Sequence, residues 1–414
     1  MIKISFVLFL CFPAFLFAND SKFDTEIYLD ARYTISKGEP SWVDNWLGKG
    51  RYGGELDGGR INKFRFSEIA VLTKFDINWD LKGFVYLKND PEQGEPVDLV
   101  EAYVRYKPAP SSVIAYEIKA GLMFPHISRE NIGVAWASPY TISPSAINSW
   151  VGEEIRVLGI EMKAKYQGDI NDITLSAAIF GFNDPAGTLL AYRGWGIGDA
   201  KVGIQGELPL ARLPSIGPNS TFLKQPNWVR PIREIDERAG YYLALDWTLY
   251  DFAQFGGLYY DNRGDPKAIE AGQYAWRTKF FNLYAELTLG LEIKVIAQYM
   301  QGSTKMGEEI FGGGRQVDVD YDAGFLLLSK QMGKFRASIR YDWFKVDDNT
   351  HILIDNNNED GDALTLAFLM MVRGNASIII EYLNIKSDRP AREDIGFESY
   401  QKNKTIQLAY RMRI

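Results

Sequence analysis

Long runs in which apolar and polar residues alternate recur along most of the sequence. In the first run, 23–35, Ile27 and Tyr33 occupy one side of the alternation, and Glu26 and Arg32 occupy the other. Successive side chains of a β-strand point to opposite faces of its sheet, so each run predicts a strand with one apolar and one polar face. Several runs are longer than a typical strand of a globular protein.

The connections between these runs alternate between short and long. The runs 316–330 and 334–346 are joined by the turn 331–333, whereas long polar connections such as 347–361 and 386–402 separate one pair of runs from the next. Long strands with short turns on one side and long loops on the other are typical of transmembrane β-barrels. A sheet in hydrocarbon must also close, because unpaired backbone groups find no water there. The sequence therefore predicts an all-β fold, a transmembrane antiparallel β-barrel.

Strand parity limits the size of this barrel. About seventeen runs can be drawn, but a single-chain bacterial barrel has an even number of strands. The run 200–208 is short, contains Gly203 and Gly206 and precedes Pro209, so we exclude it. The count becomes about sixteen, with 181–237 as one long external excursion; keeping the run and adding a missed neighbour would give about eighteen.

The N-terminus has the organisation of a secretory signal peptide. Lys3 precedes an apolar run over 4–17, and Ala18 is a small residue suited to cleavage. The run is too short to be a transmembrane helix. We expect residues 1–18 to be removed as a signal peptide and residues 19–414 to form a single barrel domain.

Composition excludes several classes of protein. The one cysteine, Cys11, lies in the signal peptide, so the mature chain has no disulfide and no thiolate metal site. Loss of Lys3 leaves 45 basic residues against 53 acidic ones, a formal charge of −8. This charge argues against nucleic-acid binding, which needs a basic surface.

The connection 121–154 is long and aromatic. Phe124, Trp136, Tyr140 and Trp150 need burial, and a long ordered connection in a compact domain is usually functional. We expect it to fold into the barrel as the third external loop and to form a pore constriction. The polar side chains expected to line that constriction are His126, Arg129, Glu130 and Asn131. The alternative is an external lid that packs on neighbouring loops or on another subunit.

Charged residues at lumen-facing positions form a second candidate site. The cations predicted for the lumen wall are Arg32, Arg105, Lys119, Lys163, Arg336, Arg340 and Arg411. The same parity assigns inward carboxylates that include Glu161, Asp318, Asp320, Asp322 and Glu381. These charges either pair across neighbouring strands or form a segregated field that sets ion selectivity. Alternation predicts the face of the sheet on which a side chain lies, but not its height along the barrel axis, so both interpretations stay open.

Catalytic chemistry has little support in the sequence. His126 and His351 are the only histidines, and no Gly-x-Ser-x-Gly motif is present, so we predict that the protein is not an enzyme and needs no cofactor. An oxygen-rich stretch offers Asp355, Asn357, Glu359 and Asp360 as a weak metal site. Its spacing departs from the EF-hand pattern, so a solvated external loop is the preferred interpretation.

The sequence resembles the Gram-negative outer-membrane porins. Three features carry this resemblance: the alternation of short turns and long loops between strands, the mature chain without cysteine, and the long third external connection. The last strand is similar to the porin assembly signal, since apolar residues occupy every second position from Ile406 to Ile414. Porins of this kind usually end in Phe or Trp, and Ile414 departs from that. The general pattern is most similar to the phosphate-selective porin O and P group. Arg129 is, however, the one clear cation of the third loop, so we do not assign the phosphate selectivity of that porin group to this chain.

This resemblance implies a location and a function. It implies the bacterial cell outer membrane, contact with the lipid bilayer and lipopolysaccharide, and a homotrimer. The function implied is a water-filled channel for passive diffusion of small hydrophilic solutes or ions, and thus ion transport. The alternative is a surface-exposed binding or structural barrel with a plugged lumen.

Overall fold

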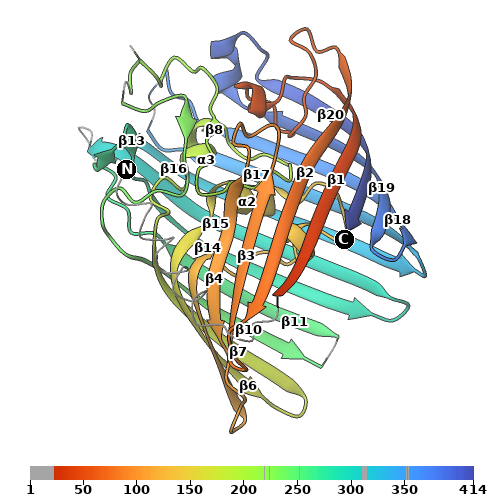
Figure 1. Cartoon of the computed structure of the whole chain (residues 1–414). Helices are drawn as coiled ribbons and strands as arrows, with labels where there is room; N and C mark the ends of the chain where they lie inside the picture. The colour runs from red at the N-terminus through yellow and green to blue at the C-terminus, as the bar shows by residue number, and fades with distance from the viewer. Residues whose placement is uncertain are drawn as a thin grey trace.

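A closed antiparallel barrel of sixteen strands dominates the computed structural model, which describes residues 23–414 except for 219, 223, 251, 310–314, 351 and 353 (Figure 1). The barrel strands, in their order around the sheet, are β1 (Phe23–Lys37), β2 (Arg60–Asp76), β3 (Leu81–Asn89), β4 (Asp98–Tyr106), β5 (Ile114–Met123), β6 (Val157–Gln167), β7 (Asn171–Gly181), β10 (Gly240–Leu249), β11 (Ala253–Asp261), β14 (Arg277–Leu289), β15 (Ile293–Glu309), β16 (Arg315–Met332), β17 (Phe335–Asp348), β18 (Glu359–Arg373), β19 (Ala376–Asp388) and β20 (Tyr400–Arg413). The predicted all-β barrel and its count of sixteen are confirmed. The proposed signal peptide and His351 lie outside the described residues.

The remaining elements are short. They are the helices η1 (Trp42–Asp44), η2 (Val134–Trp136), α2 (Ala146–Glu154), α3 (Thr188–Tyr192) and η3 (Pro390–Ile395), and two small sheets, β8 (Leu208–Pro209) with β9 (Trp228–Val229) and β12 (Ile269–Glu270) with β13 (Gln273–Tyr274). None of the helices within the described residues is long and apolar enough to cross a membrane.

The first and last strands close the barrel. β1 pairs with β20 from Tyr28 opposite Arg413 to Lys37 opposite Lys404. At the end of this seam, Ile27 and Ile414 exchange two backbone hydrogen bonds of 2.9 Å. Closure leaves the barrel sheet without a free edge, as hydrocarbon requires.

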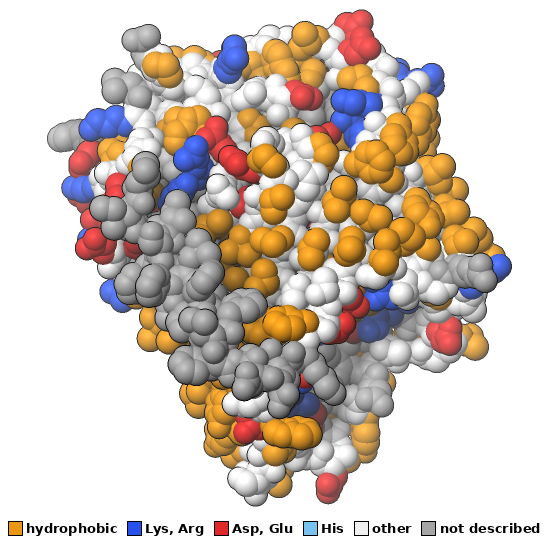
Figure 2. Space-filling view, viewed as in Figure 1, with side chains coloured by type: hydrophobic (Ala, Val, Ile, Leu, Met, Phe, Trp, Pro, Cys, Tyr) orange, Lys and Arg blue, Asp and Glu red, His pale blue; other side chains and the backbone are white. Residues whose placement is uncertain are grey.

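The two faces of the wall differ as the alternation predicts. Hydrophobic side chains gather on the outer wall (Figure 2), and Leu283 and Leu326 there are 51% and 52% exposed. The inner face carries Arg340 and Glu381, which are fully buried. It also carries apolar residues such as Phe325, because material inside the barrel covers part of this face.

Three carboxylates predicted to face the lumen lie on the other side of the wall. In β16, Val319, Tyr321 and Ala323 are buried on the inner face, so Asp318, Asp320 and Asp322 at the alternate positions point outward. Asp318 is buried on that outer face, where it pairs with Lys305 at 2.8 Å. Crossing a membrane takes about 9–11 residues of a strand, and β16 has 18. The outer end of β16 therefore extends beyond the hydrocarbon, where charged residues can face outward into water.

The outer face of β14 gives a first test of this placement. Leu283, central in β14, should tolerate Arg poorly, since Leu283→Arg puts a cation into hydrocarbon at a cost of about 2–4 kcal/mol. The matched control is Leu291→Arg, which changes the same residue type in the adjacent β14–β15 turn, where Leu291 is 79% exposed. Urea unfolding in phospholipid vesicles measures both free energies of unfolding, and equal values for the two variants would contradict the placement.

Candidate functional site

The connection between β5 and β6, residues 124–156, folds into the barrel and is called loop 3. It ends with α2, which lies behind the strands of the barrel wall in Figure 1. All nine residues of α2 are buried. The ring of Trp150 packs edge-on against Phe280 and Tyr321 of the inner wall, with ring centroids 5.4 and 5.5 Å away. Phe124 and Trp136 stack on each other at 4.2 Å. The predicted inward-folded third loop is confirmed, and burial of its aromatic residues is the physical reason.

A buried arginine of β17 clamps loop 3 to the wall. The Arg340 guanidinium is fully buried and pairs with Asp342 on its own strand at 2.8 Å and with Glu130 of loop 3 at 3.1 Å. It also donates to the backbone carbonyls of Ser143 at 2.7 Å and Pro144 at 2.8 Å. These contacts use most of the donors of Arg340, so the residue holds the loop in place and is withheld from the water of the lumen.

Two further wall residues bind the backbone of loop 3. The Glu381 carboxylate of β19 accepts hydrogen bonds from the amides of Ile142 at 2.5 Å and Ser143 at 3.1 Å. Arg411 of β20 donates to the carbonyl of Ser138 at 3.1 Å. Each charged wall group is matched to backbone groups of opposite polarity, which fixes the position of an otherwise irregular segment.

The four residues predicted for the constriction occupy different environments. His126 is exposed, and its Nε2 lies 3.0 Å from the Arg129 guanidinium. Arg129 reaches Glu286 of β14 at 3.4 Å. Glu130 is buried under Arg340, and Asn131 is buried and donates to the Trp136 carbonyl. His126 is thus the exposed member of the four, whereas Arg129 is buried, as Glu130 and Asn131 are, and its guanidinium lies over the Tyr284 ring of β14 at 4.2 Å.

The cations predicted for the lumen wall lie on the inner face. Arg32, Arg105, Lys119, Lys163, Arg336, Arg340 and Arg411 all have inward positions in the strand registers. Arg336 joins Arg340 and Arg411 in binding loop 3, through the Pro139 carbonyl at 2.8 Å. Their influence on ion selectivity stays a prediction.

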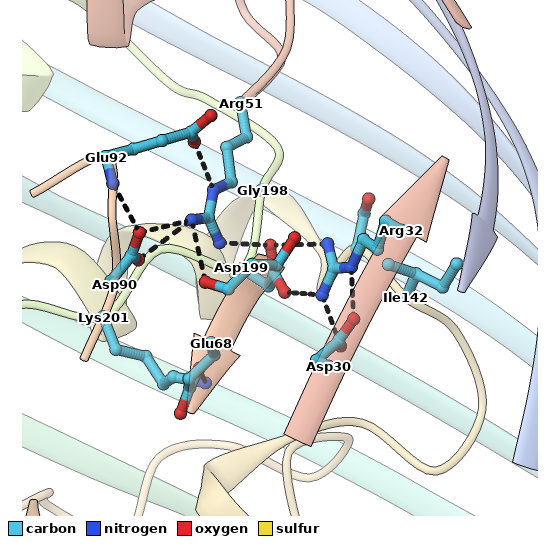
Figure 3. A network of polar contacts seen from close by, with 12 residues as sticks. Asp30, Arg32, Arg51, Glu68, Asp90, Glu92, Ile142, Gly198, Asp199 and Lys201 are labelled. Atoms are coloured by element: carbon cyan, nitrogen blue, oxygen red, sulfur yellow. Dashed lines mark hydrogen bonds and ion pairs between the residues drawn. The ribbon is translucent and has the colours of Figure 1, made fainter. Parts of the chain in front are cut away.

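A second loop also enters the lumen. The connection between β7 and β10, residues 182–239, is called loop 4, and its residues 183–202 are nearly all buried. Asp199 of this loop pairs with Arg32 of β1 and, at 3.0 Å, with Arg51 (Figure 3). Lys201 pairs with Glu68 of β2 at 2.5 Å. The segment 181–237, expected as an external excursion, therefore has an inner part that reaches the opposite wall.

Loop 4 lies directly on loop 3. The Gly198 amide donates to Ser149 Oγ at 2.9 Å, and the Val202 amide donates to the Gly152 carbonyl at 3.1 Å. Arg156 donates to the Val202 carbonyl at 2.9 Å. Loop 3 is consequently held from the side by the barrel wall and from above by loop 4.

One contact between the loops secures a strained turn. Ala135 and Trp136 of loop 3 have φ angles of 56° and 52°, in the left-handed region that residues with a Cβ rarely adopt. The Ala135 carbonyl accepts from Lys201 Nζ at 3.0 Å and from the Tyr86 hydroxyl at 3.3 Å. Such strain persists only where surrounding contacts hold it, and Lys201 of loop 4 supplies one of them.

Two carboxylates of the inner wall are each flanked by two cations. Lys119 and Lys163 lie 3.4 and 3.3 Å from Glu161. Arg129 and Lys294 both contact Glu286. Lys163 and Lys294 keep 22% and 28% of their side chains exposed, so positive charge reaches the remaining lumen.

The weak metal site does not assemble. Asp355 and Asn357 hydrogen-bond to each other at 2.8 Å, and burial raises the pKa of the Asp355 carboxyl to about 6. Glu359 is already paired with Lys49 and Arg389. Asp360 is exposed on the other face of β18.

A different group of acidic residues has the spacing for a metal ion. Oxygens of Asp184, Glu234 and Asp236 lie within 4.8 Å of one another. Burial, followed by the Glu234 carboxylate, raises the pKa of Asp184 to about 7. Sequence reasoning missed this group because about fifty residues of loop 4, without any periodic pattern, separate its members.

Comparison with known proteins shows what this architecture is similar to. No family model and no curated protein matches the sequence. Among solved structures, the outer membrane channel DcaP of Acinetobacter baumannii has a TM-score of 0.59 at 10% identity, over 95% of this chain and 97% of that one. The anion-selective porin from Comamonas acidovorans has a TM-score of 0.53 at 11% identity, over 95% and 100%. The trimer form of OmpT, an outer membrane protein of Vibrio cholerae, has a TM-score of 0.50 at 11% identity, over 94% and 99%.

The chain has the fold of an outer-membrane porin. Because the sequence identities are only 10–11%, these similarities show a shared fold and nothing more specific. The resemblance to the phosphate-selective porin group stays a prediction.

Removing the central clamp of loop 3 tests its role. Arg340→Met leaves Glu130 and Asp342 buried without their cation, so the free energy of unfolding should fall by about 3–5 kcal/mol. Trypsin should also begin to cleave after Arg129 in the folded barrel. The control Lys345→Met changes a half-exposed cation on the outer face of β17 and should cost less than ~1 kcal/mol. Equal losses in the two variants, or a loop 3 that stays resistant to trypsin, would contradict the clamp.

Proposed function

We propose that this chain forms a water-filled channel in the bacterial outer membrane for passive diffusion of small hydrophilic solutes or ions. The observation that carries the proposal is a closed barrel with an apolar outer wall and an inner wall on which charged side chains remain accessible beside loop 3. Hydrophilic side chains facing a lumen favour water there, and a loop inside the barrel limits the size of a solute. Transport of this kind needs neither an energy source nor a cofactor, and no catalytic step is proposed.

The proposal includes the location and assembly implied by the fold. An apolar outer wall suits a lipid bilayer, and export would use residues 1–18 as a cleaved signal peptide. A homotrimer is also proposed, in line with the trimer form described for the Vibrio cholerae protein.

A barrel with a plugged lumen is the second candidate, and loop 4 favours it. Residues 183–202 reach from β7 across to Arg32 of β1 and Glu68 of β2, so two layers of chain occupy the lumen. Under the channel proposal, solutes pass beside these layers, and both layers contribute to the restriction.

Replacing the two loops in turn separates these candidates. One variant carries a Gly-Ser linker in place of 127–148, a second carries one in place of 186–202, and a third carries both. Each replacement removes chain that fills the lumen, so single-channel conductance in a planar bilayer should rise in each variant and most in the third.

A Gly-Ser replacement of 269–272, which are exposed residues at the β12–β13 turn, serves as the control and should leave conductance unchanged. Heat-modifiable migration verifies that each barrel is folded. A wild-type protein that does not conduct, combined with conduction after removal of both loops, would support the plugged barrel and reject the channel.

We also propose that the lumen prefers anions. Glu161 and Glu286 are each in ion-pair contact with two cations, so each of these ion-pair groups has one positive charge more than its carboxylate balances. Fixed positive charge in a narrow aqueous passage raises the local concentration of anions.

Neutralising the accessible members of these clusters should reduce the preference. The double variant Lys163→Gln, Lys294→Gln should move the reversal potential in a salt gradient towards cation preference. Lys345→Gln, on the outer face of the wall, should not move it. An unchanged reversal potential in the double variant would show that these charges do not set selectivity.

A further inference from the structure

A pocket of about 340 Å³ lies inside the barrel, between loop 3 and the inner wall formed by β17–β20 and β1. Residues 133–134 and 137–139 of loop 3 line one side of it, and Gln331, Gly374 and Asn375 lie at its other end. These last three residues are in or next to the short turns that join β16 to β17 and β18 to β19. Short turns of a transmembrane barrel are periplasmic, so the pocket lies on the periplasmic side of loop 3, away from loop 4. We call it the periplasmic pocket.

Two arginines that line this pocket have no carboxylate partner among the described residues. The Arg336 guanidinium donates to Gln331 Oε1 and to the Pro139 carbonyl, both at 2.8 Å. It also lies over the Tyr140 ring at 5.1 Å, which further restricts its orientation. The two hydrogen bonds use two of its five N–H donors, so three remain on the terminal nitrogens. Arg413 is exposed, and its side chain forms no hydrogen bond or ion pair within the described part of the chain.

The carboxylates around the periplasmic pocket do not cancel this charge. None of them belongs to the described residues that line it. Asp30 contacts Arg411, the third arginine of the pocket, at 2.8 Å. Asp24 lies opposite Lys74 of β2, and Glu26 lies on the same face of β1 between Asp24 and Asp30. Even if Glu26 balances one of the two free arginines, the other is left without a carboxylate.

Much of the remaining lining of the periplasmic pocket is apolar. Its apolar residues include Val134, Ala137, Pro139, Leu369, Met371, Ile379 and Met412. Apolar walls favour a ligand with an apolar body and disfavour a small inorganic anion, because such an ion would lose hydration that these walls cannot replace. The volume is at the lower end of the range for small-molecule pockets, which indicates a small ligand.

We propose that the periplasmic pocket binds a small organic carboxylate with an apolar body. The carboxylate accepts charge-assisted hydrogen bonds from both terminal nitrogens of Arg336, a geometry that a planar guanidinium offers. The apolar body lies against the apolar lining, and the positive charge of Arg413 attracts the anion to the open end of the pocket. The inference rests on the proposed function and deepens it, because it names a class of solute for which the lumen has a binding site.

Binding of fluorobenzoate to the mature protein in nonionic detergent tests the charged part of the site. Fluorine NMR titration gives its Kd, and wild type should bind it saturably. Arg336→Gln should weaken binding by on the order of tenfold, because the charge-assisted hydrogen bonds to the carboxylate are lost. The control Lys165→Gln removes an inward cation of β6 that is 41% exposed and does not line the pocket, so it should leave the Kd nearly unchanged.

A second variant fills the pocket while Arg336 and its hydrogen bond to loop 3 stay in place. Ser377 of β19 is a half-buried residue of the lining, and Ser377→Phe should exclude the apolar body of the ligand and weaken binding. Thr248→Phe adds the same ring near the periplasmic end of β10, on the inner face but outside the pocket, and is the matched control. Heat-modifiable migration and resistance of loop 3 to trypsin verify that each variant keeps its fold.

Several results would overturn the proposal. They are the absence of saturable binding to folded wild-type protein, and equal losses in the pocket and control variants. Displacement of fluorobenzoate by inorganic phosphate at equal concentration would indicate an inorganic-anion site. Equal affinity for fluorobenzamide, the neutral analogue, would show that the pocket does not recognise the carboxylate. A loss of binding in Arg336→Gln without a loss in Ser377→Phe would show that Arg336 acts only through the position of loop 3.

The binding measurement is independent of conduction, so the two proposals can fail separately. Folded protein that conducts potassium chloride but binds no fluorobenzoate would reject this site and leave the channel in place. Folded protein that binds fluorobenzoate but gives no conductance steps would reject the channel and leave the site in place.

Discussion

Hydrogen bonding between charged wall residues and the backbone of loop 3 is the interaction on which the interior depends. Apart from the short helix η2, loop 3 is irregular between Phe124 and Ala146, and a buried irregular segment must find partners for its amides and carbonyls. Arg340, Glu381 and Arg411 provide them from the last third of the barrel. The hydrogen bonds of these charged groups depend in turn on burial by the loop, because water in an open barrel would weaken each of them.

The second inward loop completes this arrangement. Asp199 and Lys201 tie loop 4 to β1 and β2, and Lys201 also bonds to the strained turn at Ala135. Positions of loop 3 and loop 4 are therefore coupled through shared contacts. A movement of loop 4 would remove a support of loop 3, so the width of the lumen depends on both segments.

Period-two alternation is local, which is why the strands and their number could be predicted from the sequence. The direction of loop 4 could not, since 183–202 has no period and its partners Arg32 and Glu68 are more than 100 residues away. The sequence predicts Glu130 as a pore residue, because its partner Arg340 lies 210 positions later and no local pattern links the two. Parity predicts an inward Asp320 because it gives the charged side of each run to the lumen, and this prediction is wrong where β16 leaves the hydrocarbon and charged residues face water on the outer side.

The central claim is a continuous aqueous path past both loops. Single-channel recording of the unmodified protein, with polyethylene glycols of graded size in the bath, tests it most directly. The account predicts discrete conductance steps that small polymers reduce and larger polymers leave unchanged. Protein that is folded, as shown by heat-modifiable migration, but gives no steps at all would contradict it.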